Sequence, residues 1–411
     1  MRFAIYTLGC RLNFAETEEL TDALVKEGFE FSFSHPQLIV VRGCSVTKKA
    51  EKETEIKIKE LKRKEKKSFI IASGCLRKDF FSQFADLIIP KENEKYLLAE
   101  IKKFLKGDRS QKKEIKLRTR SFIKIQDGCK NYCSYCLIPY LRGREKSISW
   151  KKIIKRIKEK EEIGYREIVL TGVNISRWRN KLKMRNGKSK TLDLVWLIKK
   201  ILKMTNIPRI RISSIWPNAL NKKLISCFKN NRICSHLHLS LQSLSDSLLK
   251  KMGRNYTFQE IEDKIKLIRK LYPHLTLTAD IIVGFPGEND KEFNKTYKNL
   301  KKLDLAKIHV FRYSVREKTA AAYFPNQLEE KIKKKRAKII LSLSNQLNKN
   351  WRKKFLNRTR DVLFEQKKDG FWQGLTDNYL KVFVKSKKDL ANQILPVKLM
   401  KLYQDGIIGK L

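Results

Sequence analysis

Three short apolar runs near the start of the chain each end in the dipeptide Gly-Cys. They are FAIYTLGC, LIVVRGC and FIIASGC, at residues 3–10, 38–44 and 69–75. Their β-branched and aromatic content predicts strands, and the apolar spacing of the stretches between them, Asn13–Glu27 and Val46–Glu65, predicts amphipathic helices. Strands that alternate with helices predict right-handed crossovers and a parallel sheet.

The cysteines at the ends of these runs occupy equivalent places. In a parallel sheet the carboxyl ends of the strands share one edge, where ligands gather, and a preceding glycine lets the backbone turn tightly there. We therefore predict that Cys10, Cys44 and Cys75 meet in space, although they are far apart in the sequence. The alternative is three cysteines that are buried independently.

A second alternating pattern follows a charged stretch, Lys102–Arg120, which we interpret as a linker. Six apolar runs separated by helical segments predict a partial (β/α)6 barrel, with its chemistry at the carboxyl ends of the strands. The predicted strands are Phe122–Gln126, Glu167–Thr171, Arg209–Ser213, Leu237–Leu241, Thr276–Val283 and Lys307–Tyr313. The predicted helices are Ser149–Ile163, Leu192–Met204, Asn218–Lys229, Thr257–Leu271, Asp290–Lys302 and Gln327–Asn348.

From about Trp351 the pattern changes to short strand-like pieces separated by turns, such as Lys368-Asp369-Gly370. The pieces Asp361–Phe364, Leu380–Val384 and Gln393–Leu399 predict a small all-β domain. The predicted fold is thus α/β, with an N-terminal parallel-sheet domain at 1–112, a central barrel at 118–348 and an all-β domain at 351–411.

Composition narrows the class of protein. The 92 Lys and Arg against 43 Asp and Glu give a net charge of +49, which favours a polyanionic partner such as RNA, even though a Lys-rich compositional bias explains part of the excess. The chain has no apolar run long enough to span a membrane, so we expect a cytoplasmic protein without a membrane partner. In that compartment its eight cysteines should be reduced, which favours metal or cluster binding over disulfides.

The segment Cys129-Lys-Asn-Tyr-Cys133-Ser-Tyr-Cys136 directly follows the first predicted barrel strand. A cubane cluster usually takes four thiolates, one for each iron, so three in one loop leave an iron open to another ligand. A zinc site is the alternative, but structural zinc sites prefer four ligands and paired C-x2-C units.

This triplet resembles the radical S-adenosylmethionine (SAM) enzymes, in which SAM binds the open iron. The resemblance implies that Tyr135 lies beside the adenine. The loops after the second and fifth predicted strands carry glycines that let backbone approach a ligand. With Tyr135, the predicted SAM contacts are Gly172, Asn174, Gln242 and Gly284.

Taken together, the two cysteine sets and the small last domain resemble the methylthiotransferases over essentially the full chain. The anchors of this resemblance are Thr7–Asn13 with Glu16 and Glu18, Gly43–Thr47, Ser73–Cys75, Ile125–Cys129, Glu167–Gly172, His236–Ser243, Asp280–Glu288 and Phe311–Ser314. The family implies that Cys10, Cys44 and Cys75 hold an auxiliary [4Fe–4S] cluster, so that the cofactors are two [4Fe–4S] clusters and SAM. It also implies that the last domain is an RNA-binding TRAM barrel.

The opening TLGCRLN, the segment GCSVTKKAE and residues 209–215 most resemble the branch that methylthiolates C2 of N6-threonylcarbamoyladenosine beside the tRNA anticodon. Two positions depart from the family: Trp216 stands where Glu is usual, and Leu244 replaces a Gly. The implied partners are the anticodon stem-loop of tRNA and an electron donor such as flavodoxin or ferredoxin, and we expect a monomer. No protein acid or base is assigned a catalytic role.

Other functions stay open at this point. Within the family they are the modification of isopentenyladenosine in tRNA or of an aspartate in a ribosomal protein, and outside it a non-catalytic RNA-binding iron–sulfur sensor. Among the remaining residues, Cys227 and Cys234 are expected to pack in the core, and His236 and His238 to line a pocket with their polar atoms paired. Trp372 and Tyr379 are expected to be core aromatics, with stacking on RNA bases as the alternative.

Overall fold

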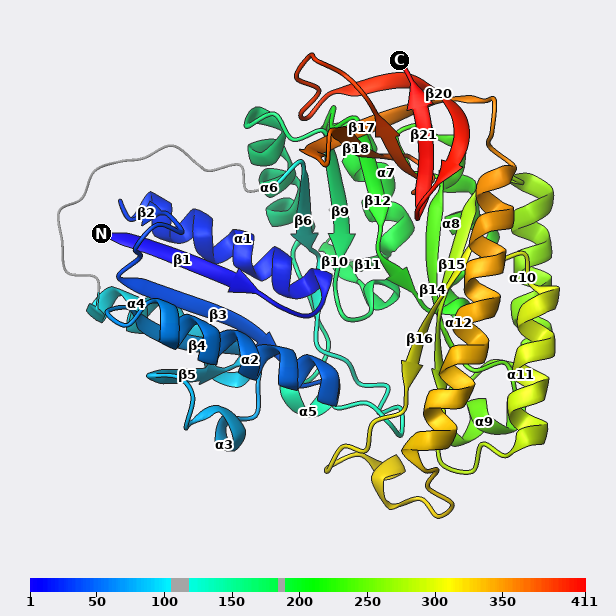
Figure 1. Ribbon diagram of the computed structural model, residues 1–411, viewed down its shortest axis with the longest axis horizontal. Coiled ribbons are helices and arrows are strands. Elements are labelled where there is room, and N and C mark those ends of the chain that lie inside the picture. Colours follow the sequence, from blue (N-terminus) through cyan, green and yellow to red (C-terminus); the bar gives the residue numbers. More distant parts are fainter. Residues whose placement is uncertain (105–117, 184–188) are drawn as a thin grey trace.

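The computed structural model describes residues 1–104, 118–183 and 189–411. Its first part is a five-stranded parallel sheet of order β2-β1-β3-β4-β5, which confirms the predicted parallel sheet and adds two short edge strands (Figure 1). The strands are β1 (Arg2–Thr7), β2 (Glu30–Phe31), β3 (Leu38–Cys44), β4 (Phe69–Cys75) and β5 (Leu87–Pro90). The helical segments are α1 (Arg11–Lys26), α2 (Lys48–Lys64), α3 (Lys78–Phe81), η1 (Lys91–Tyr96) and α4 (Leu97–Phe104).

The central part is the predicted barrel of six parallel strands, open between its first and last strand. The hydrogen-bonded strands form two sheets that meet at Ser213. Before Ser213 the third strand (β12) pairs with β9, and after it the continuation of that strand (β13) pairs with β14. The six strands are β6 (Arg120–Lys124), β9 (Glu167–Thr171), β12 (Arg209–Ile212) with its short continuation β13 (Ser214–Ile215), β14 (His236–Gln242), β15 (Thr276–Val283) and β16 (Lys307–Arg312). The outer helices are α6 (Trp150–Glu162), α7 (Leu194–Met204), α10 (Phe258–Leu271), α11 (Asp290–Lys302) and α12 (Glu330–Lys353).

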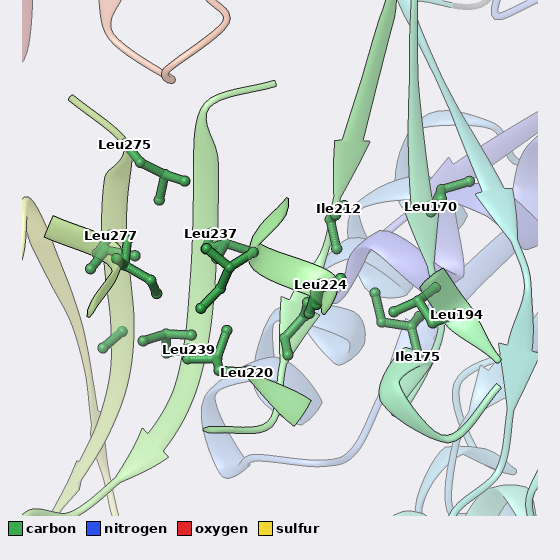
Figure 2. Packing of buried hydrophobic residues seen from close by; sticks show 14 of the residues in the cluster. Leu170, Ile175, Leu194, Ile212, Leu220, Leu224, Leu237, Leu239, Leu275 and Leu277 are labelled. Atoms are coloured by element: carbon green, nitrogen blue, oxygen red, sulfur yellow. The ribbon is translucent and has the colours of Figure 1, made fainter. Parts of the chain in front are cut away.

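Alternation along the barrel strands separates apolar from polar side chains. Leu237 and Leu239 of β14 and Leu277 of β15 join the large apolar core that packs the strands against the helices (Figure 2). The residues that alternate with these leucines, such as His236 and Thr278, belong to the opposite face because successive side chains point to opposite sides of a strand. The interior of this barrel is therefore polar in β14 and β15, unlike the apolar interior of a closed eight-stranded barrel.

Helix α1 of the N-terminal sheet packs against the first barrel strands. The rings of Phe14 and Phe122 stack with their centroids 5.9 Å apart, and Ala15, Phe122 and Val169 form a small buried cluster. The buried Glu18 carboxylate accepts a hydrogen bond from the Ser121 hydroxyl at 2.6 Å. This contact fixes the N-terminal sheet against the barrel.

The last part is a closed five-stranded barrel of order β17-β18-β19-β21-β20, which confirms the expected small strand-rich region. Asp369 and Gly370, both with positive φ, form the predicted turn between β17 and β18. The strands are β17 (Thr359–Lys368), β18 (Phe371–Thr376), β19 (Lys381–Val384), β20 (Ile394–Tyr403) and β21 (Gly406–Lys410).

Two arginines of β12 dock this small barrel onto the end of the central barrel at which the strands begin. Arg209 donates to the Leu375 and Asp361 carbonyls at 2.9 and 2.7 Å, and Arg211 donates to the Asp377 carbonyl at 2.9 Å. Arg211 also pairs with the fully buried Glu167 at 2.7 Å. Although burial raises the pKa of Glu167, the guanidinium of Arg211 lowers it below its ordinary value.

Some expectations were wrong in detail. The single helix predicted over 218–229 is broken into η3 (Pro217–Ala219), α8 (Lys222–Ile225) and η4 (Ser226–Lys229), because the Asn221 side chain caps a new helix start. Most of the predicted linker lies outside the described residues, and its beginning belongs to α4.

The remaining short elements are β7 (Gln126–Asp127), α5 (Ile138–Arg142), β8 (Lys146–Ser147), η2 (Ile175–Arg177), β10 (Asn180–Lys183), β11 (Ser189–Leu192), α9 (Asp246–Lys251) and η5 (Ala320–Tyr323). Within the described ranges, we find no helix with the length and apolar character needed to cross a membrane.

The buried pair between Arg211 and Glu167 leads to a prediction about stability. Arg211→Met should lower the free energy of unfolding by about 3–5 kcal/mol, because it leaves the Glu167 carboxylate buried without its main partner. Arg166→Met, at the exposed neighbouring position, is the matched control and should change stability by no more than about 0.5 kcal/mol. Urea unfolding followed by circular dichroism measures both, and equal effects would contradict this role of the pair.

Candidate functional site

The structure brings together the ends of the three strands that carry Cys10, Cys44 and Cys75. Cys44 and Cys75 are register partners at the ends of β3 and β4. Gly9, with φ of +91°, turns the chain so that Cys10 becomes the N-cap residue of α1. A Cβ on Gly9 would lie 2.8 Å from the Cys44 Cβ, so only glycine allows this approach. The predicted convergence of the first three cysteines is therefore present.

These thiols lie in surroundings that oppose their ionisation. Burial, together with the neighbouring Cys75 and Cys10, raises the pKa of Cys44 to about 12. Burial also raises the pKa of Cys75, against the opposing effect of Arg142. Three thiolates at this edge would repel one another unless a cationic group held them together, and the irons of a cluster supply such charge.

Among residues 1–104, 118–183 and 189–411, no three His, Cys, Asp or Glu side chains are grouped so as to hold one metal ion.

Cys129, Cys133 and Cys136 lie in the loop between β7 and α5, which is pinned at several points. The Cys129 N–H donates to the Gly143 carbonyl at 3.1 Å, and the Cys136 N–H donates to the Cys133 carbonyl at 2.9 Å. Burial, together with the other two thiols of the loop, raises the pKa of Cys136 to about 12. The positive charge of iron would therefore stabilise the thiolates of the second set for the same reason as those of the first.

Arg142, the last residue of α5, connects the helix that follows the triplet to the first cysteine set. The helix begins directly after the loop of the triplet, yet Arg142 Nε donates to the Sγ of Cys75 at 3.0 Å. The same guanidinium donates to Glu16 Oε1 at 2.9 Å and to Asn13 Oδ1 at 3.1 Å. Only 1% of the Arg142 side chain is exposed. The sequence did not predict this role, because the contact joins residues that are 67 positions apart.

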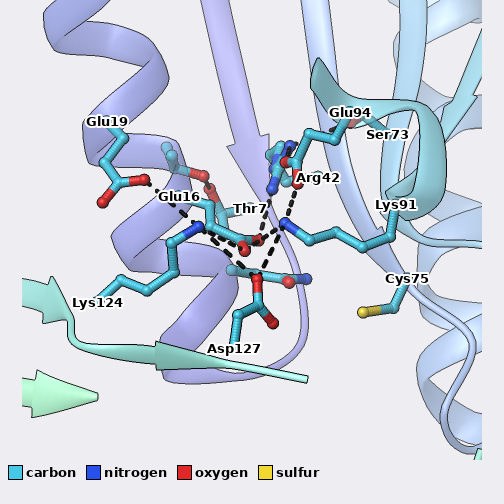
Figure 3. A network of polar contacts seen from close by, with 12 residues as sticks. Thr7, Glu16, Glu19, Arg42, Ser73, Cys75, Lys91, Glu94, Lys124 and Asp127 are labelled. Carbon is cyan, nitrogen blue, oxygen red and sulfur yellow. Dashed lines mark hydrogen bonds and ion pairs between the residues drawn. The ribbon is translucent and has the colours of Figure 1, made fainter. Parts of the chain in front are cut away.

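Glu16 is the centre of a buried charge network on one side of Cys75 (Figure 3). Its carboxylate pairs with Arg42 at 2.7 Å, with Lys124 at 3.3 Å and with Lys91. Burial alone would raise the pKa of Glu16, but Arg142 and the other three cations hold it well below its ordinary value. The network includes groups from the N-terminal sheet and from the central barrel, so it fixes the edge with Cys75 against the loop of the triplet.

A second arginine, Arg254, faces the triplet itself. Its Nη1 lies 3.7 Å from the Sγ of Cys133, and its Nε donates to the Tyr256 hydroxyl at 2.8 Å. The guanidinium carbon lies 3.6 Å from the ring centroid of Trp216. Trp216, which replaces the family's usual Glu, therefore positions this arginine through a cation–π contact.

Leu244, the other departure from the family pattern, has a simple packing explanation. It is fully buried in the main core and does not have the positive φ that would require glycine. Cys227 and Cys234 are buried as well, as expected for packing residues.

The residues predicted to contact SAM are spread over the strand ends near the triplet. The space beside Gly172 is filled by the Gln126 carbonyl, 2.6 Å from a built Cβ, and the space beside Gly284 by the Lys333 stem at 2.3 Å. Protein packing thus explains both glycines. Tyr135 packs against the apolar cluster that contains Leu248, Met252, Ile282 and Phe285. Gln242 ends β14 with φ of +69°, and its contact with SAM stays a prediction.

Asn174 lines a cavity of about 350 Å³ beside the loop of the triplet, together with Asn131, Trp216 and Gly253. The Oδ1 atom of Asn174 and the Nδ2 atom of Asn131 are buried without a hydrogen-bond partner among the described residues. A polar ligand in this cavity would satisfy both atoms.

The remaining predicted residues lie around a second cavity. His236 and His238 both line it, as expected, but the Nδ1 atom of His236 is buried and unpaired, so the expectation that both histidines are satisfied was wrong. Trp372 packs in the core of the small barrel, as expected. Tyr379 instead stacks on His236, with ring centroids 4.6 Å apart.

Comparison with known proteins agrees with this arrangement. Residues 123–300 match the Radical SAM superfamily, and residues 2–89 match the "Uncharacterized protein family UPF0004". The chain is 30% identical to the threonylcarbamoyladenosine tRNA methylthiotransferase MtaB of Bacillus subtilis, over 98% of this chain and 95% of that protein. It is 32% identical to the tRNA-2-methylthio-N(6)-dimethylallyladenosine synthase of Endomicrobium trichonymphae, over 100% of this chain and 99% of that protein.

Among solved structures, a similar fold is that of the radical SAM methyltransferase TsrM of Kitasatospora setae. It has a TM-score of 0.55 and 13% identity, over 78% of this chain and 77% of that chain. The predicted α/β radical SAM fold is thereby confirmed. Because its curated relatives match over nearly their full length, this chain belongs to the radical SAM methylthiotransferase family.

Proposed function

We propose that this enzyme adds a methylthio group to C2 of N6-threonylcarbamoyladenosine next to the anticodon of tRNA. The observation that carries the proposal is the contact between Cys75 of the first cysteine set and Arg142, which belongs to the helix that directly follows the second set. Cys129, Cys133 and Cys136 would hold the cluster that binds SAM, and Cys10, Cys44 and Cys75 would hold the auxiliary cluster. Members of this family use SAM and two [4Fe–4S] clusters.

When bound, these cofactors supply a 5′-deoxyadenosyl radical, which can take a hydrogen atom from an unreactive aromatic C–H bond, and the sulfur and methyl groups that replace it. The protein's own residues position and shield these groups. Arg142 would stabilise the thiolate of Cys75, since hydrogen bonds from a guanidinium favour the charged form of a thiol, and Arg254 would lie beside the cluster held by Cys133. The buried network of Glu16 would keep the two sites at a fixed separation.

A tRNA substrate is supported by three observations. The net charge of +49 favours a polyanion. The small C-terminal barrel, which docks on the central barrel through Arg209 and Arg211, would be an RNA-binding TRAM domain. The curated relatives named above are tRNA-modifying enzymes by name. The electron donor would be a flavodoxin or a ferredoxin, and the enzyme would act as a monomer in the cytoplasm.

Two tRNA substrates compete for the assignment, because relatives with both names match at similar identity. The segments TLGCRLN and GCSVTKKAE favour the threonylcarbamoyl branch. Mass spectrometry of tRNA nucleosides from cells with and without the gene tests the choice. We expect loss of the methylthio form of threonylcarbamoyladenosine alone, whereas loss of the methylthio form of isopentenyladenosine would contradict the proposal.

The separate roles of the two cysteine sets can be tested with single variants. Cys133→Ala should abolish 5′-deoxyadenosine formation from SAM, whereas Cys44→Ala should retain it and lose sulfur transfer. Liquid chromatography of anaerobic reactions with reduced enzyme measures both products. Cys227→Ala, a packed cysteine outside both sets, is the control and should retain both activities. Sulfur transfer by the Cys44 variant would contradict the role assignment, and wild-type protein that forms no 5′-deoxyadenosine would favour the sensor.

The contact between Arg142 and Cys75 leads to a prediction about cluster retention. Arg142→Gln should lose the iron of the auxiliary cluster to a chelator about 10–100 times faster than wild type, because residues that support a metal ligand typically contribute this much to affinity. The rate of iron loss from Arg142→Lys should lie between the rates of wild type and Arg142→Gln. Iron release followed by absorbance measures the rate.

Lys124→Gln is the matched control for this experiment. Lys124 belongs to the same network around Glu16, at 3.3 Å, but no contact with a cysteine is described for it. If Lys124→Gln accelerates iron loss as much as Arg142→Gln, the network as a whole and not the N–H···S contact protects the cluster.

A further inference from the structure

A polar cavity of about 440 Å³ lies where the three parts of the chain meet. Arg11 comes from the N-terminal sheet, His236, His238 and Thr278 from inside the central barrel, and Tyr379 from the small C-terminal barrel. Arg11 directly follows Cys10, so one wall of the cavity adjoins the predicted auxiliary site. The methylthiotransferase assignment gives this cavity no role.

A chain of hydrogen-bond contacts links the histidines of the cavity. The Asp280 carboxylate lies 2.9 Å from Nε2 of His238, and the Thr278 hydroxyl lies 2.8 Å from Nδ1 of His238 and 3.1 Å from Nε2 of His236. With neutral rings, His238 donates to Asp280 and accepts from Thr278, and Thr278 in turn accepts from His236. This order leaves Nδ1 of His236 as a hydrogen-bond acceptor.

Two polar atoms at this cavity have no partner among the described residues. They are Nδ1 of His236, in a side chain that is 1% exposed, and Nη1 of Arg11, whose Nη2 donates to the Tyr379 hydroxyl at 3.2 Å. Leaving buried polar atoms unpaired costs free energy, so such atoms indicate a bound group. The pair offers one cationic donor and one acceptor.

The electrostatics of the cavity favour an anion. Three guanidinium groups, those of Arg11, Arg120 and Arg211, lie within 5.8 Å of the Tyr379 ring centroid. Burial would raise the pKa of Tyr379, but these guanidinium groups lower it below its ordinary value. Burial lowers the pKa of His236 well below its ordinary value, and Arg211 and Arg11 lower it further. Two carboxylates at the rim are already paired, the half-buried Glu365 with Arg120 and the exposed Asp405 with Lys381.

We propose that this cavity binds the N6 side chain of the target nucleoside, with Arg11 pairing with its carboxylate and His236 accepting a hydrogen bond from its hydroxyl or amide group. The inference rests on the proposed function and deepens it, because it makes Arg11 and His236 the residues that determine the substrate branch. A threonylcarbamoyl group carries a carboxylate, a hydroxyl and amide N–H groups. A dimethylallyl group carries none of these and would leave both buried atoms unpaired, which is the kind of mismatch that discriminates most strongly between substrates.

The test compares the affinities of anaerobically reconstituted, full-length protein for anticodon stem-loop RNAs that differ only at the target nucleoside. The RNAs carry N6-threonylcarbamoyladenosine, its carboxylate methyl ester, N6-dimethylallyladenosine or unmodified adenosine, and fluorescence anisotropy gives the dissociation constants. For wild type we expect about tenfold tighter binding of the free acid than of the ester, because a hydrogen bond between charged groups is lost.

Arg11→Gln should reduce this preference to about one, by weakening the binding of the acid while leaving the ester and dimethylallyl RNAs unchanged. His236→Phe keeps an aromatic ring against Tyr379 and should weaken the binding of the acid and of its ester alike. Lys381→Gln removes a cation that lines the same cavity but is paired with Asp405, so it should leave the preference intact. Iron content is measured for each variant to verify that both clusters are loaded.

Two results would overturn the assignment of the cavity: an Arg11 variant that keeps the preference for the acid, or one that weakens all four RNAs equally, as a contact with an RNA phosphate would. The proposed function is judged separately, by which RNA the wild-type enzyme methylthiolates. If the wild-type enzyme converts the threonylcarbamoyl RNA but the Arg11 variant keeps the wild-type preference for the acid, the proposed function stands and the role of the cavity is rejected. Conversion of the dimethylallyl RNA alone would reject the function.

Discussion

The buried carboxylate of Glu16 is the interaction on which the arrangement of the two cysteine sets depends. It lies on α1, the helix that Cys10 begins, and it pairs with cations of β3, of η1, of β6 and of α5. Isolated charges are very costly to bury, so each of these elements is stable only in the position that brings its cation to Glu16. One of the cations, Arg142, also reaches Cys75. The carboxylate therefore sets the distance between the N-terminal sheet and the loop of the triplet.

A second constraint is the polar interior of the open barrel. Its strands bury apolar residues against the outer helices, which leaves charged and histidine side chains on the inner face of β12, β14 and β15. Apolar packing alone cannot cover this polar inner face. In this protein α1 covers part of it, and the small barrel covers the end of the central barrel at which the strands begin. Arg211 illustrates the solution, because it pairs with Glu167 inside the barrel and donates to a carbonyl of the small barrel. The cavity around His236 lies where α1 and the small barrel leave this inner face uncovered.

The sequence predicted those features that repeat with a regular period. Three strands ending in Gly-Cys could be assigned to one sheet edge, and six β/α units to a partial barrel, since hydrophobic periodicity and parallel topology determine both. Edge strands such as β2, with two residues, were missed because they are too short to show a period.

Contacts between distant side chains could not be predicted in the same way. Arg142 lies close to the triplet in the sequence, but its contact with Cys75 depends on how two sheets pack. The stack of His236 on Tyr379 depends in turn on the docking of the small barrel. Trp216 looked like a loss of the family's Glu, and only the structure shows that its ring lies against the guanidinium of Arg254.

The central claim is that the two cysteine sets hold two clusters close together on either side of Arg142. The most direct measurement is the electron paramagnetic resonance spectrum of the fully reduced, full-length protein. It is compared with the spectra of two triple variants, Cys10/Cys44/Cys75→Ala and Cys129/Cys133/Cys136→Ala, each of which keeps one cluster. We predict a wild-type spectrum broadened by magnetic interaction between the clusters, beyond the sum of the two variant spectra. A wild-type spectrum equal to that sum would contradict the claim.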